Sequence, residues 1–188
     1  GILFSGVLLH VMKSGGDLTI SALTNTQALS SWLILLGVAV NAAIPPLHIW
    51  LADAYPKATV TGAVFLSAFT TKTAVYVLAR VFYGWEILLI FGTIMTLYGV
   101  IFAVLANDIR GILAYHIISQ VGYMVAGIGI GTEMALNGSV SHAFSHILYK
   151  ALLFMSTGAV LHMTGKIRAT DLGGLYKTMP YTAVRCMI

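Results

Sequence analysis

Long apolar segments separated by short polar breaks constrain this chain more than any other feature of its sequence. A helix that crosses the roughly 30 Å hydrocarbon core of a bilayer needs about 20 mostly apolar residues. Segments of that kind recur along the chain, and the breaks between them contain Gly, Pro, Asp and Lys. Since such short connections suit helices and no short alternating strands occur, we expect an all-α polytopic membrane helix bundle.

The sequence predicts several complete spans and two partial ones. The complete spans run over Ser30–Leu51, Thr59–Phe82, Glu86–Ala106, Ile112–Gly131 and Ala135–His162. A truncated span covers Gly1–Met12, and a last one starts near Met179. Because the chain has no starting methionine and stops inside an apolar run, we expect residues 1–188 to be one transmembrane domain from an internal part of a longer protein.

Charge is scarce throughout the chain. Only 9% of the residues are charged, whereas a soluble domain carries about 25%, so a water-soluble globule is excluded. The net charge of +4 is ordinary loop chemistry in a membrane protein, and we expect no nucleic acid as a partner. The single cysteine, Cys186, excludes a disulfide framework and a cysteine-clustered metal site.

Positive charges divide unequally between the two sets of loops. One set contains Lys57, Arg110, Lys166, Arg168 and Lys177, and the other contains Lys13 and, near a helix end, Arg80. Lys and Arg concentrate in cytoplasmic loops, so we expect the loops at Lys57, at Arg110 and from Lys166 to Lys177 to face the cytoplasm.

Two lysines lie about midway along predicted spans, Lys72 in Thr59–Phe82 and Lys150 in Ala135–His162. Each costs roughly 2.5 to 3.5 kcal/mol on insertion scales, so each should face protein or a water-filled cavity, and a functional role is the default. The alternative is a structural lysine paired with a carboxylate or with capping carbonyls. Because no Asp or Glu is predicted at this depth, a carboxylate partner would come from outside these residues.

His142, His146 and Lys150 follow one another at intervals of four residues, which places them along one face of a helix. Histidine titrates near neutral pH, so this stripe contains groups that can exchange protons. We interpret it as a proton relay. Two alternatives stay open: the histidines form structural hydrogen bonds to Ser and Thr on neighbouring helices, or one is an axial haem ligand with His116 as the facing partner.

Pro45 and Pro46 follow Asn41 inside the predicted span Ser30–Leu51. Proline removes a backbone donor and clashes with the preceding turn, so this helix should be kinked or broken there. Broken transmembrane helices leave carbonyls and amides that can line an ion path. We therefore expect Asn41, Pro45 and Pro46, together with His116, to line the path that contains the buried lysines.

Several motifs occur in an order that is known from one family. They are PLHIWLADAYP at Pro46–Pro56, TKTAVYVLAR at Thr71–Arg80, DIRGILAY with SQVGY at Asp108–Tyr115 and Ser119–Tyr123, HAFSHILYKALLF at His142–Phe154, and LGGL at Leu172–Leu175. In these motifs the chain resembles the antiporter-like subunits that are shared by Mrp-type multisubunit cation/proton antiporters and respiratory complex I, the NADH:quinone oxidoreductase.

The resemblance implies a row of buried charges whose protonation changes drive ion translocation. Lys72 matches the family's proton-carrying lysine, whereas Asn41 stands where a second lysine is usual and cannot carry a proton. The resemblance also implies a bacterial inner membrane, other membrane subunits as partners besides the lipid bilayer, and protons with Na⁺ or K⁺ as transported ions. No nucleotide-binding glycine motif or cysteine set occurs, so we expect no cofactor and no metal in this chain.

Within the family, the segment from Ala58 to Tyr76 looks closer to the D-like subunit of the Mrp antiporters. The first alternative is a proton-pumping membrane subunit of complex I, in which electron transfer takes place in other subunits. A non-pumping structural subunit, suggested by Asn41, is a second alternative. A haem-bearing electron carrier that uses His116 with His142 or His146 is a third.

Overall fold

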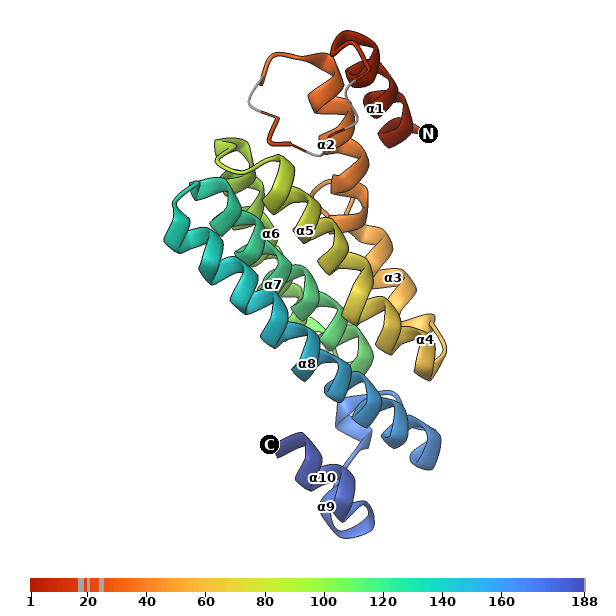
Figure 1. Ribbon diagram of the computed structural model, residues 1–188. Helices are drawn as coiled ribbons and strands as arrows, with labels where there is room; N and C mark the ends of the chain where they lie inside the picture. Colours follow the sequence, from red (N-terminus) through yellow and green to blue (C-terminus); the bar gives the residue numbers. More distant parts are fainter. Residues whose placement is uncertain (17–18, 20, 24–25, 188) are drawn as a thin grey trace.

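In the described part of the chain, all assigned secondary-structure elements are helical (Figure 1). The structure is a computed structural model, and it describes residues 1–16, 19, 21–23 and 26–187. The elements are α1 (Ile2–Lys13), α2 (Leu29–Ala42), α3 (Ile49–Lys57), α4 (Val60–Phe65), the π-helical turn η1 (Leu66–Thr70), α5 (Thr71–Val81), α6 (Glu86–Leu105), α7 (Ile109–Ile130), α8 (Glu133–Thr164), the 3₁₀ turn η2 (Ala169–Asp171), α9 (Leu175–Thr178) and α10 (Pro180–Met187). The predicted all-α bundle is confirmed.

Among the described residues, 4 helices are long and apolar enough to cross a membrane. They are Val60–Val81, which joins α4, η1 and α5, and then α6, α7 and α8. Each overlaps a predicted span, with ends that differ by three residues or fewer. The agreement follows from length and hydropathy, since a continuous apolar helix of this size is shielded from water along its length by the hydrocarbon core of a bilayer.

The predicted span Ser30–Leu51 is divided into α2 and α3. Helix α2 ends at Ala42, Ala43 adopts a left-handed φ of 57°, and α3 begins only at Ile49. The Trp50 indole donates to the carbonyl of Val40 at 2.9 Å, which satisfies a carbonyl at the open end of α2. The break expected from the two prolines is confirmed, but α3 continues to Lys57 and thus beyond the predicted end of the span.

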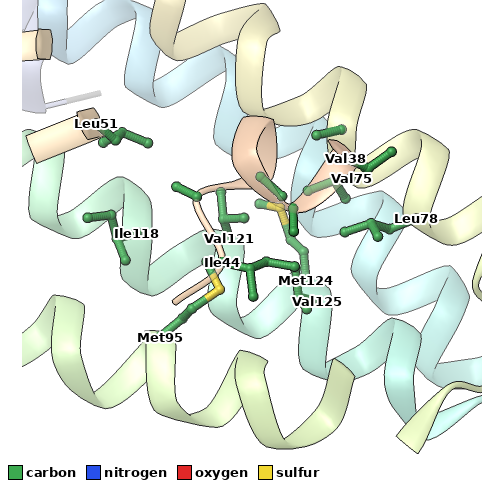
Figure 2. Close-up of a cluster of buried hydrophobic side chains, with 14 of the residues drawn as sticks. Val38, Ile44, Leu51, Val75, Leu78, Met95, Ile118, Val121, Met124 and Val125 are labelled. Carbon is green, nitrogen blue, oxygen red and sulfur yellow. The ribbon is translucent and has the colours of Figure 1, made fainter. Parts of the chain in front are cut away.

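Helix α7 lies at the centre of the bundle and packs against α6, α8, α3 and α5. Its buried side chains meet apolar side chains from α2, the α2–α3 break and α3, α5 and α6 (Figure 2). The residues labelled there are Val38, Ile44, Leu51, Val75, Leu78, Met95, Ile118, Val121, Met124 and Val125. Because α7 is covered on several sides, Ser119 is fully buried on it and His116 and Gln120 are half-buried, whereas Tyr123 is exposed.

Helices α6 and α7 approach each other at glycines. A Cβ atom added at Gly92 would overlap the backbone of Gly122 and Ala126, and one added at Gly99 would overlap the backbone of Ser119. Small residues allow such close backbone approach in membranes, where van der Waals packing drives helix association.

Most of the positively charged loops meet at one end of the bundle. The loop before α7 pairs with the segment after α8, since Ile109 donates its backbone N–H to Ile167 at 3.1 Å and Ala169 donates to Asn107 at 2.8 Å. The opposite end joins the α5–α6 turn to α7, because Gly84 donates to Ile128 at 3.1 Å. The predicted division of the loops into two sets therefore corresponds to two ends of the bundle.

Arg110 is not a free loop charge. It lies in the first turn of α7, is buried, and donates through Nη2 to the carbonyls of Ala58 at 2.9 Å and of Tyr55 and Thr59 at 3.4 Å. A cation at the C-terminal end of a helix satisfies its last carbonyls and interacts favourably with its dipole. Arg110 thus fixes the end of α3 to α7.

Candidate functional site

Lys72 lies at the beginning of α5, directly after the π-helical turn η1. Its side chain is buried, and the ammonium Nζ donates to the Ser67 carbonyl at 2.7 Å and to Thr71 Oγ1 at 3.1 Å. Ser67 belongs to the π turn itself. Such turns are uncommon inside α-helices and occur frequently at functional sites.

Lys150 is fully buried in the middle of α8. Its Nζ donates to the Leu113 carbonyl of α7 at 3.1 Å. All hydrogen bonds recorded for the two ammonium groups go to carbonyl or hydroxyl oxygens, not to carboxylates. Among the described residues, the two ammonium groups are thus bonded by neutral oxygen atoms and by no carboxylate.

The histidine stripe of α8 has the geometry that its spacing predicts. The ring centroids of His142 and His146 are 6.1 Å apart, and the His146 ring lies 5.0 Å from that of Tyr149 in an edge-on arrangement. His146 is fully buried, and neither of its ring nitrogens has a hydrogen-bond partner among the described residues. The same is true of Nε2 of His142.

Three helices bring five basic side chains into one group, which we call the lysine–histidine cluster. It consists of Lys72 of α5, His116 of α7, and His142, His146 and Lys150 of α8. Lys72 interacts electrostatically with Lys150, and His116 interacts with Lys150 and His142. His146 interacts with all four of the other members. The cluster therefore contains all the residues predicted as relay groups, together with His116.

A recess of about 550 Å³ lies between α7 and α8, beside one end of the cluster. Its lining includes His142 and Ser139 of α8 and Gln120 of α7. Gln120 also accepts a hydrogen bond of 3.5 Å from the hydroxyl of Tyr149. The rest of the lining is mostly apolar, so His142, Ser139 and Gln120 are the side chains through which the recess can contact a polar group.

The break between α2 and α3 contains the other residues that were predicted to line the path, Asn41, Pro45 and Pro46. None of them takes part in the interactions described above for the lysine–histidine cluster. Asn41 and Pro46 are exposed, and Pro45 is half-buried. Their role in lining an ion path stays a prediction.

His48 and Tyr55 were not predicted as site residues, although both fall within the PLHIWLADAYP motif. His48 is buried edge-on against Tyr98, with ring centroids 4.2 Å apart, and neither of its ring nitrogens has a partner among the described residues. Tyr55 is fully buried and donates to the carbonyl of Leu66 at 2.9 Å. The PLHIWLADAYP motif was the sequence feature that could have pointed to His48 and Tyr55. It did not show which of its side chains turn toward the interior of the bundle.

In the described part of the chain, no group of three or more His, Cys, Asp or Glu side chains is placed to hold a metal ion. What the cluster offers chemically is a set of imidazole and amine nitrogens in a low-dielectric interior. Such nitrogens accept and release protons without breaking other bonds.

Comparison with known proteins identifies the same architecture. The sequence profile of the family described as "NADH:quinone oxidoreductase/Mrp antiporter, TM" matches residues 1–188. A protein from Alkalihalophilus pseudofirmus that is named as the D-type component of a Na⁺/H⁺ antiporter is 34% identical over 177 residues, which cover 89% of this chain and 35% of that protein. A protein from Desulforudis audaxviator that is named as the N-type component of an NADH-quinone oxidoreductase is 35% identical over 165 residues, which cover 79% of this chain and 32% of that protein.

A solved structure shows the same fold. One chain of the Mrp complex from a Dietzia species superimposes with a TM-score of 0.89 at 32% sequence identity, over 99% of this chain and 37% of that one. The chain therefore spans about a third of the length of the relatives that it matches.

Proposed function

Since the chain belongs to the NADH:quinone oxidoreductase/Mrp antiporter transmembrane family, we propose that it forms part of a proton- and cation-translocating subunit of an Mrp-type multisubunit Na⁺/H⁺ antiporter. The observation that carries this proposal is the lysine–histidine cluster, in which Lys72, His146 and Lys150 are buried inside an integral membrane protein. Charged groups at such depth are costly and mark ion pathways. The proposed partners are other membrane subunits in a bacterial inner membrane, and the transported ions are protons with Na⁺ or K⁺.

The path begins at the recess between α7 and α8. From there protons pass to His142, then to His146 and Lys150, and Lys72 takes up and releases the proton that is linked to cation movement. An imidazole can accept a proton on one nitrogen and release it from the other, which suits His142 and His146 to relay. Among the described residues, Nε2 of His142 and both ring nitrogens of His146 have no hydrogen-bond partner, which supports this role.

The electrostatic interaction between Lys72 and Lys150 supplies the linkage between steps. Two like charges repel strongly in a low-dielectric interior. Arrival of a proton at one lysine therefore favours departure of a proton from the other. This linkage needs both lysines in place, and neither forms a recorded bond to a carboxylate that would cancel the repulsion.

The test is the substitution Lys72→Ala in the complete subunit within its assembled complex. We expect cation-driven proton flux in sealed vesicles to fall to background, because Ala cannot carry a proton. The matched control is Lys57→Ala, since Lys57 is an exposed lysine near the end of the bundle and should leave flux unchanged. Normal flux from the Lys72 variant at normal assembly would remove Lys72 from the mechanism.

The second candidate function is that of a proton-pumping membrane subunit of complex I, which the 35% identity to the NADH-quinone oxidoreductase component favours. Purifying the tagged complete subunit with its partners distinguishes the two. Other antiporter subunits and Na⁺- or K⁺-driven proton flux support the Mrp assignment. Flavin and iron–sulfur subunits with quinone reductase activity support complex I. A structural subunit that pumps nothing predicts changed assembly, or no change at all, in the lysine variants.

A further inference from the structure

Tyr55 connects the broken helix to the π-helical turn that precedes Lys72. Its ring is fully buried on α3 and packs against Phe154 of α8, with ring centroids 6.4 Å apart. Its hydroxyl donates to the carbonyl of Leu66, the first residue of η1, at 2.9 Å. One hydroxyl thus joins α3 to the first residue of the π turn.

The same turn presents the oxygen that Lys72 uses. The Ser67 carbonyl, one residue after Leu66, accepts the 2.7 Å hydrogen bond from Lys72 Nζ. A π turn departs from the α-helical hydrogen-bond register, so a hydrogen bond from outside its own helix can favour one geometry of the turn over others. Among the described residues, Tyr55 donates the hydrogen bond that the π turn receives from outside the helix Val60–Val81.

Helix α3 is itself held in place from α7. The Arg110 guanidinium donates to the carbonyls of Tyr55, Ala58 and Thr59, so the end of α3 that carries the phenol is fixed to the centre of the bundle. A buried hydrogen bond from a fixed donor restrains its acceptor more than one from a mobile side chain, because little further entropy is lost.

We propose that Tyr55 is a positioning residue for proton translocation: its hydroxyl holds the π turn in the geometry that aims the Ser67 carbonyl at Lys72. This inference rests on the proposed function of Lys72 and adds a residue to it. Tyr55 acts through the turn and does not carry the proton. The titratable groups that face Lys72 are His142, His146 and Lys150 on α8, and His116 on α7 reaches it through Lys150 and His142.

The test compares Tyr55→Phe with Phe154→Leu in the complete assembled complex. Tyr55→Phe keeps the ring and removes only the hydroxyl. Phe154→Leu disturbs the packing around that ring and leaves the hydroxyl in place. We expect the Tyr55 variant to displace the pH profile of cation-driven proton flux by at least about half a pH unit, which is roughly threefold in rate on the flank of the profile. The Phe154 variant should lower the amount of assembled complex or the rate at every pH without displacing the profile.

Amide hydrogen exchange provides the second measurement. Residues 66–72 should exchange about fivefold faster in the Tyr55 variant than in the wild type, as expected for the loss of one internal hydrogen bond. An unchanged pH profile with unchanged exchange, or an equal displacement in the Phe154 variant, overturns the inference. If Lys72→Ala leaves flux intact, the proposed function fails by itself, and hydrogen exchange at residues 66–72 still decides whether Tyr55 holds the turn.

Discussion

His146 is the residue on which the lysine–histidine cluster is centred. It is fully buried and interacts with Lys72, His116, His142 and Lys150. Its two ring nitrogens have no hydrogen-bond partner among the described residues, so in the proposed relay this residue would pass a proton between several basic neighbours.

Replacing His146 by Asn should therefore interrupt the relay while keeping a polar side chain of similar size. We expect cation-driven proton flux in vesicles to fall at least about tenfold, in line with the loss of a positioned proton-transfer group. The control is His162→Asn, because His162 is exposed in the last turn of the same helix. Equal fluxes from the two variants would mean that His146 is a structural histidine.

At the scale of single residues, the sequence predicted part of the lysine–histidine cluster. The four-residue spacing placed His142, His146 and Lys150 on one face because helix periodicity is local. The meeting of Lys72 with them depends on how α5 packs against α8, which spacing alone does not contain. Tyr55 and His48 were missed because hydropathy does not tell an inward polar side chain from an outward one.

Among the elements, the pair α6 and α7 depends on glycines that let two backbones touch. Gly92→Ala should destabilise the complex, because a methyl group there would overlap the backbone of Gly122 and Ala126. We expect a loss of about 1 to 3 kcal/mol, as for other overpacked sites, seen as a lower unfolding temperature in detergent. Gly138→Ala on α8 is the control, since nothing lies within 4 Å of its added Cβ atom. A Gly138 variant that loses as much would show that the α6–α7 contact is not the cause.

The helices were predicted well where the apolar sequence was continuous. Spans α6, α7 and α8 follow from length and hydropathy, and the break after α2 follows from two prolines. The π turn was not predicted, because nothing in the composition of Leu66–Thr70 distinguishes it from an α-helical segment, and the hydroxyl of Tyr55 that donates to Leu66 comes from another helix. Arg110 was assigned to a loop because Asn107 and Asp108 look like a break and the next span was predicted to start only at Ile112, whereas Asp108 is the N-cap of α7.

For the whole molecule, the arrangement of the loops predicts which end of the bundle faces the cytoplasm. The ends of α8 offer a direct test, because Glu133 and Lys166 are both exposed and lie at its opposite ends. In a Cys186→Ser background, Lys166→Cys should react with a membrane-impermeant maleimide in inside-out vesicles, and Glu133→Cys should react in intact cells. The reverse labelling would overturn the predicted orientation.

The length of the histidine stripe also has an electrical meaning. His142 and Lys150 are eight positions apart on α8, a rise of about 12 Å at 1.5 Å per residue. That is roughly two fifths of a 30 Å hydrocarbon core. A proton that travels the stripe would therefore cross at most about two fifths of the membrane potential, or about 0.9 kcal/mol per 100 mV. The rest of the voltage must fall across the steps before and after the stripe, so the step along the stripe should depend on voltage less steeply than a full transmembrane charge movement does.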